Sequence, residues 1–243
     1  MVAWLIIPNN STAQNMDFLW VQKDKSELYS ISNGGRGVAT DNAGNVYVAG
    51  RFRTQISFGK KYLSSNDGIG NSHVENVFLV KYDALGNYIW ARKVEGIVSV
   101  NDIAVDGAGN AYIAGSFDER AIFENTTSSG KVTITGSSDM FLAKYDTYGL
   151  LNWVNKAGGT GTDDATAIAL DNLGHPYLTG SFKGTATFSY TTITATNGQD
   201  NIFVAKYDKS TGLLEFVKKV GEDNNDNVTD IEVDGAGNIY LAG

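Results

Sequence analysis

Short runs of alternating hydrophobic and polar residues, separated by turns rich in Asp, Gly and Asn, fill most of this chain. Alternation with a period of two is typical of β-strands, and these runs lack the 3.6-residue period of a helix. One ten-residue unit, Asp-x-x-Gly-Asn-x-Tyr-hydrophobic-Ala/Thr-Gly, occurs four times, 65, 65 and 63 residues apart: at 41–50, 106–115, 171–180 and 234–243. This regular spacing predicts an all-β repeat protein.

The start of each unit predicts a β-hairpin turn. Asp at the first position and Gly at the fourth fit a type I turn followed by a left-handed residue. Gly109, like its counterparts, is expected at positive φ, where a Cβ would clash. The third copy carries His175-Pro176 where the pattern has Asn and a hydrophobic residue, which puts that one turn in doubt.

Two further motifs recur in a fixed order after this unit. Phe-x-x-Lys-Tyr-Asp stands at 78–83, 141–146 and 203–208, and aromatic-x-x-Lys at 20–23, 90–93, 153–156 and 216–219. Each repeat therefore holds two hairpins and four strands, which is typical of a β-propeller blade. The last strand is interpreted as an exposed outer edge whose Lys blocks edge-to-edge pairing; a ring of ligand-facing lysines is the alternative.

The turn unit and the Phe-x-x-Lys-Tyr-Asp unit resemble those of the bacterial SBBP-type β-propeller repeat family, from about Asp17 to Gly243. The resemblance implies an all-β propeller of four-stranded antiparallel blades in a large secreted or cell-surface protein. It implies no catalytic residues, because the family has no general active-site motif.

The motifs divide the chain into an N-terminal extension and a propeller region. Residues 1–16 are interpreted either as the remnant of a secretory signal or as an ordinary β-strand. Residues 17–243 hold a lone outer strand, three complete repeats and a partial one: 17–23, 37–96 (repeat 1), 102–159 (repeat 2), 165–221 (repeat 3) and 228–243 (repeat 4). We expect an open or incomplete ring, with a closed four-blade ring as the alternative if residues 2–7 supply the missing strand.

Each complete repeat has an insert between its second and third strands: 52–76, 117–139 and 182–201. The inserts are longer than most connections in compact domains. Phe58, Phe123 and Phe188 recur in them 65 residues apart and are expected to fix a small extra hairpin to the blade. The insert tips differ most between copies, and variable loops on a regular scaffold favour binding.

The composition excludes several classes of partner and site. The 243 residues carry a net charge of −8 and lack a basic stripe, which argues against nucleic acid as the main partner. The absence of cysteine excludes disulfides and thiolate metal sites but leaves the compartment open. No hydrophobic run reaches the roughly 18 residues of a membrane span.

The search for catalytic and metal-binding residues is largely negative. His73 and His175 lie in unlike positions of different repeats, and neither has a metal-ligand partner at a recognised spacing. We therefore predict no catalytic, cofactor-binding or metal residues and no cofactor. Asp223, Asn225 and Asn227 have the alternate spacing that begins a calcium loop, but the required Gly and later Glu are absent, which leaves calcium as a weak alternative.

The resulting hypothesis is a non-enzymatic β-propeller scaffold of a secreted or cell-surface bacterial protein. It would bind a protein or glycan through the insert loops, and pack against the rest of a larger propeller or self-associate. Two alternatives remain. A domain of a glycan-active enzyme would show carboxylates or histidines clustered at the channel mouth. A lectin-like module would show an equivalent polar and aromatic pocket in each insert.

Overall fold

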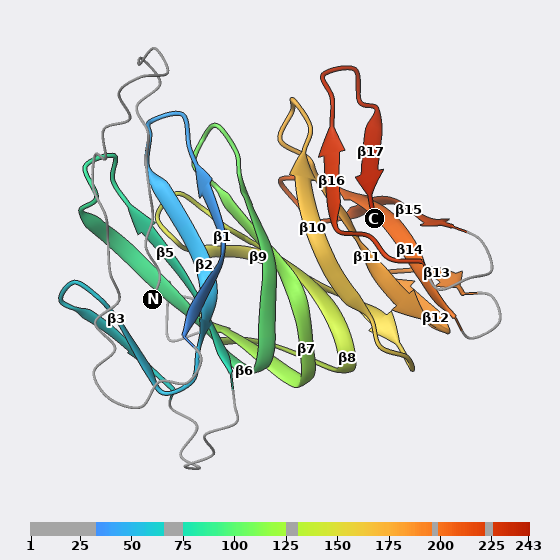
Figure 1. Ribbon diagram of the computed structural model, residues 1–243, viewed down its shortest axis with the longest axis horizontal. Coiled ribbons are helices and arrows are strands. Elements are labelled where there is room, and N and C mark those ends of the chain that lie inside the picture. Colours follow the sequence, from blue (N-terminus) through green and yellow to red (C-terminus); the bar gives the residue numbers. More distant parts are fainter. Residues whose placement is uncertain (1–32, 66–74, 125–130, 196–198, 222–225) are drawn as a thin grey trace.

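The computed structural model describes residues 33–65, 75–124, 131–195, 199–221 and 226–243, and its regular elements are all β-strands (Figure 1). The expected extension 1–16 and lone strand 17–23 lie outside these residues. The described part of the chain holds no helix with the length and hydrophobicity needed to cross a bilayer. The predicted all-β class is confirmed.

The strands follow the predicted order within each repeat. In chain order they are β1 (Gly34–Thr40), β2 (Val46–Phe52), β3 (Gln55–Phe58), β4 (Lys61–Ser64), β5 (Asn76–Tyr82), β6 (Tyr88–Val105), β7 (Ala111–Glu124), β8 (Lys131–Tyr145), β9 (Leu151–Gly159), β10 (Asp164–Leu170), β11 (Pro176–Lys183), β12 (Thr185–Phe188), β13 (Thr191–Thr194), β14 (Asp200–Tyr207), β15 (Leu214–Val220), β16 (Asp230–Val233) and β17 (Ile239–Ala242). Repeat 3 forms the four-stranded sheet β10-β11-β14-β15, and β16-β17 begins repeat 4. In the described residues no sheet closes on itself.

The insert hairpins join successive repeats into one nine-stranded sheet, β1-β2-β5-β6-β7-β8-β9-β12-β13. The insert part of β7 pairs with the end of the repeat 1 strand in β6, with Ala121 opposite Gly96. The insert strand β12 pairs in the same way with β9, where Ala186 faces Gly159. Each of these hairpins therefore extends the last strand of the repeat before it.

This pairing corrects the interpretation of the last strand as an exposed edge in repeats 1 and 2. Lys93 is buried, and its amine donates a 2.7 Å hydrogen bond to the carbonyl oxygen of Ser64 in the insert. Lys156 donates likewise to Thr135. The sequence interpretation was wrong because the insert hairpin of the next repeat pairs with the end of each of these two strands. The Lys156 side chain itself is 48% exposed. In repeat 3, β15 does end its sheet.

The third strand of each repeat forms the centre of the core, and the insert aromatics pack on it. All seven residues of β5 are buried. The rings of Phe58 and Phe78 lie 5.1 Å apart, and the equivalent pairs Phe123–Phe141 and Phe188–Phe203 lie 5.4 and 4.9 Å apart. The prediction that these aromatics fix a small hairpin to the blade is confirmed.

The turns have the predicted geometry, including the third. Gly109 has a φ of 82°, and its amide donates a 2.9 Å hydrogen bond to the carbonyl of Asp106. In the third turn the amide of Gly174 donates to Asp171 at 2.8 Å, and that of Asp171 to His175 at 3.1 Å. The unusual His175 therefore leaves the backbone of the turn unchanged.

Side chains of each repeat also reach the turns of the next one. The hydroxyl of Tyr47 donates to the carbonyl of Gly109 at 2.8 Å, and Tyr112 donates to Gly174 at 3.3 Å. The same direction holds for Lys81 and Trp90, which both donate to the carbonyl of Thr147. These contacts, which we call the inter-repeat contacts, position each repeat against the next one.

Candidate binding site on the insert side

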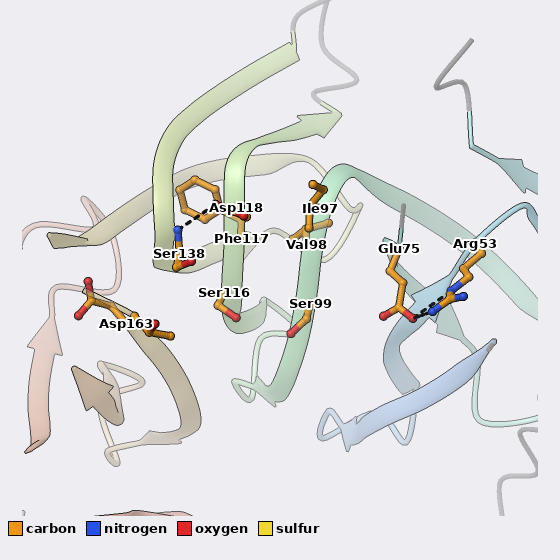
Figure 2. A pocket seen from close by; sticks show the side chains of 11 residues that line it. Arg53, Glu75, Ile97, Val98, Ser99, Ser116, Phe117, Asp118, Ser138 and Asp163 are labelled. Carbon is orange, nitrogen blue, oxygen red and sulfur yellow. Dashed lines mark hydrogen bonds and ion pairs between the residues drawn. The ribbon is translucent and has the colours of Figure 1, made fainter. Parts of the chain in front are cut away.

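A cavity of about 310 Å³ opens where the inserts meet the links between repeats (Figure 2). We call it the insert-side pocket. Residues of repeats 1 and 2 and of the links that follow each of them form it: Arg53, Glu75, Ile97, Val98, Ser99, Ser116, Phe117, Asp118, Ser138, Thr162 and Asp163. Because the first strands and the inserts of neighbouring repeats converge here, the pocket depends on the repeat arrangement.

Equivalent backbone positions around the pocket carry unlike side chains. Arg53 and Asp118 each follow a buried Phe at the end of the second strand, and Lys183 holds the same place in repeat 3. The charge at this position therefore alternates in sign from repeat to repeat. Asp163 lies just before repeat 3, and the equivalent positions before repeats 2 and 1 hold Val98 and Asn33. One scaffold thus presents a different surface in every repeat.

Ion pairing fixes the basic side of the pocket. Glu75 accepts two hydrogen bonds from the guanidinium of Arg53, at 2.9 and 3.1 Å (Figure 2). Its other oxygen accepts a 2.7 Å hydrogen bond from Arg51. The two arginine side chains are about one-third exposed and the glutamate is 19% exposed. The paired charges hold the planar guanidinium of Arg53 in one orientation at the rim.

The acidic side is fixed by backbone amides. Asp118 accepts hydrogen bonds from the amides of Ser138, at 3.2 Å, and Glu119, at 3.1 Å. Both donors have positive φ, 54° for Ser138 and 59° for Glu119, a conformation that costs L-residues about 1–2 kcal/mol. The carboxylate of Asp118 therefore stabilises a bulged backbone where the insert leaves the blade.

Asp163 is a fully buried carboxyl group next to the pocket. It accepts hydrogen bonds from the amides of Gly159 at 2.8 Å and Lys183 at 3.3 Å. Burial raises the pKa of Asp163 to about 6, an effect that these two hydrogen bonds oppose. In repeat 1 the side-chain oxygen of Asn33 accepts the equivalent hydrogen bond from the amide of Arg53.

We expect Asp163 to make stability depend on pH between about 4 and 6. Below this range the carboxyl is neutral in both states. As the pH rises the unfolded chain ionises first, so the free energy of unfolding falls by about 3 kcal/mol until the folded carboxyl ionises near pH 6. Asp163→Asn, which introduces the residue type that Asn33 provides in repeat 1, should remove this component.

Urea unfolding of both proteins from pH 4 to pH 7.5 measures the effect. The other carboxylates are common to the two proteins, so the difference between the curves isolates Asp163. Parallel curves would show that burial does not perturb this carboxyl group.

The charged groups that line the pocket have structural partners. Its carboxylates are engaged by Arg53 or by backbone amides. Its three serines share it with no histidine among the described lining residues. It offers an apolar floor of Ile97, Val98 and Phe117 under a rim of fixed positive and negative charge.

The structure describes only some of the histidines and calcium-loop residues that the sequence singled out. His73, Asp223 and Asn225 lie outside the described residues, so the calcium alternative stays a prediction. The fold brings His175 together with Asp208 and Glu215, which the sequence search missed because they are more than thirty residues away. The one signal was that His175 departs from the Asn of the other turns.

Comparison with known proteins agrees with this repeat geometry. Residues 90–116, which run from β6 across the Asp106 turn into β7, match the SBBP family, described as a beta-propeller repeat. This segment is an SBBP beta-propeller repeat. The matched segment contains the turn unit at 106–115, one of the two motifs from which the sequence resemblance was drawn, and the resemblance is confirmed here. The Phe-x-x-Lys-Tyr-Asp units lie outside the matched residues.

Two curated relatives extend the similarity beyond the SBBP segment. An uncharacterized WD repeat-containing protein, L264, of Acanthamoeba polyphaga mimivirus is 30% identical over 207 residues, covering 72% of this chain. The regulatory protein FlaEY of Caulobacter vibrioides is 28% identical over 197 residues, covering 79% of this chain. The chain spans 15% and 20% of the length of these two relatives.

Proposed function

We propose that this chain is a non-enzymatic β-propeller scaffold that binds a protein partner through its insert side. In this proposal each complete repeat forms one four-stranded blade of an open array. The alternating charge at Arg53, Asp118 and Lys183 carries the proposal, because these residues share one backbone position yet present different chemistry. Constant backbone with variable side chains is the usual arrangement of a binding face on a repeat scaffold.

Three further observations support this function. The insert-side pocket combines an apolar floor with charged groups of fixed orientation, as protein interfaces do. Its carboxylates have structural partners, which favours binding over catalysis. Neither relative's name denotes an enzyme, and one is a regulatory protein.

We place the protein in the secreted or cell-surface proteins of bacteria, an assignment that rests on the SBBP resemblance. Localisation of the chain in its source cells, by protease accessibility of intact cells, tests this assignment. Digestion only after lysis would overturn it.

Site-specific photo-crosslinking tests the insert side as the binding face. Tyr62 and Tyr190 lie on insert hairpins and are 60% and 102% exposed, whereas Leu85 and Tyr148 lie on turns and are 80% and 73% exposed. A photoreactive residue at the insert positions should give a defined protein adduct in source cells, at least about fivefold above the turn positions.

Equal labelling of both sides, or adducts only from the turns, would contradict the proposal.

The exposed Tyr62 and Tyr190 rings also favour the lectin-like alternative, since sugars stack on exposed aromatic rings. A glycan array with the purified chain separates the two: saturable glycan binding lost on Tyr62→Ala would replace the protein partner with a carbohydrate.

A further inference from the structure

A second cluster of polar side chains lies on the turn side of repeat 3, separate from the insert-side pocket. His175 ends the third turn just before β11, Asp208 follows β14, and Glu215 lies near the start of β15. One ligand atom from each residue lies within 4.8 Å of the others. The antiparallel pairing of β11, β14 and β15 brings these three side chains together.

The imidazole of His175 has an unsatisfied nitrogen in this cluster. Its Nδ1 atom is buried and makes no hydrogen bond with the described residues. Glu215 Oε1 lies 3.1 Å from it and Asp208 Oδ2 lies 3.9 Å from it. A buried nitrogen without a hydrogen bond is costly, so its direction toward two carboxylates calls for a partner.

The other repeats show that this arrangement is specific to repeat 3. Asn45, Asn110 and Asn238 occupy the position of His175, and each donates from Nδ2 to the Asp of its own turn, at 2.7–2.8 Å. In repeat 3 the imidazole ring of His175 is instead directed at Glu215. The residues at the position equivalent to Glu215 are Ile89 in repeat 1 and Asn152 in repeat 2. Both members of the pair differ from the other repeats together.

Not all of the carboxylate charge around His175 is paired with Lys206. Lys206 is shared between Asp171, at 3.3 Å, and Glu215 Oε2, at 3.2 Å. Asp208 uses Oδ1 to accept the amides of Ser210 and Thr211, while Oδ2 faces His175. Lys206 thus pairs with Asp171 and with one oxygen of Glu215, while Asp208 Oδ2 and Glu215 Oε1 face the imidazole.

We propose that His175, Asp208 and Glu215 bind one divalent transition-metal ion, such as Zn²⁺. One imidazole nitrogen and two carboxylate oxygens are ligands that Zn²⁺ accepts, at about 2.0–2.2 Å, with water at the fourth position. Asp208 and Glu215 are about one-third exposed, so their side chains can rotate by the small distance that ligation requires. The metal would link the third turn to β14 and β15.

Calorimetric titration of the full, tag-free chain with ZnCl₂ at pH 7.5 tests the site. We expect one Zn²⁺ per chain in the wild type, and at least about tenfold weaker binding for His175→Asn and Glu215→Asn. His175→Asn introduces the residue of the other turns, and Glu215→Asn that of repeat 2, so both should fold. His73→Asn, which removes the chain's other histidine, is the matched control and should bind as the wild type.

Nitrogen NMR of the imidazoles gives an independent readout, because ligation shifts the Nδ1 resonance of His175 and leaves that of His73 unchanged. Absence of stoichiometric Zn²⁺ binding, or binding that survives both His175→Asn and Glu215→Asn, would overturn the proposal. If one variant fails to fold by circular dichroism, the other variant and the NMR shift still decide.

Discussion

Replacing Gly109 with Ala is expected to lower the free energy of unfolding by about 3 kcal/mol. Gly109 has a φ of 82°, where an added Cβ is strained. That Cβ would also lie 2.8 Å from the hydroxyl of Tyr47 and 3.0 Å from Asp41 Oδ2. The substitution therefore displaces the inter-repeat contact in which Tyr47 donates to the carbonyl of Gly109.

Gly174→Ala is the matched control for this effect. Its φ is also 82°, but an added Cβ meets nothing closer than 3.6 Å, from the Lys209 side chain. We expect only the backbone strain, about 1–2 kcal/mol. Urea unfolding of both variants gives the difference. Equal losses would show that the clash at Gly109 is relieved without breaking the contact between repeats.

The local elements of this fold could be predicted because each depends on residues close in sequence. The Asp-x-x-Gly turns specify their own geometry, since Asp106 and Gly109 form the hydrogen bond and the positive φ within four residues. The insert hairpins were predicted from the periodic aromatics. Phe123 recurs with its counterparts and packs on Phe141 as expected.

The relations between repeats could not be predicted, because period and motif describe one repeat at a time. The aromatic-x-x-Lys strand looked like an exposed edge, yet Lys93 is covered by the insert of its own repeat. The Lys of the Phe-x-x-Lys-Tyr-Asp motif was recognised only as a recurring residue. The structure shows that Lys81 reaches a turn 66 residues away.

The candidate site was predicted only in outline. Variable inserts pointed to the side of the scaffold on which the insert-side pocket lies, but the pocket itself also needs Val98 and Asp163 from the links between repeats. His175 was set aside because a metal ligand was sought at short spacing. Its neighbours Asp208 and Glu215 come from strands that become adjacent only in the folded sheet.

Replacing Lys81 with Met is expected to cost about 2–3 kcal/mol and to uncouple the unfolding of repeat 1 from that of repeat 2. The Lys81 side chain is 5% exposed, and its amine donates to the hydroxyl of Thr147 at 2.9 Å and to its carbonyl at 3.3 Å. It also lies 3.7 Å from Asp41 and 4.8 Å from the centre of the Tyr47 ring. Met keeps the volume but supplies none of these polar contacts.

Lys93→Met is the control that separates lost stability from lost coupling. Lys93 is as deeply buried as Lys81, but it donates to Ser64 within repeat 1. Both variants should therefore lose stability. Hydrogen exchange should show earlier opening of β2 and β5 relative to β8 in Lys81→Met alone, because only that change removes a contact between repeats. Simultaneous exchange of these strands in Lys81→Met would mean that the remaining inter-repeat contacts, from Tyr47 and Trp90, suffice to keep the two repeats cooperative.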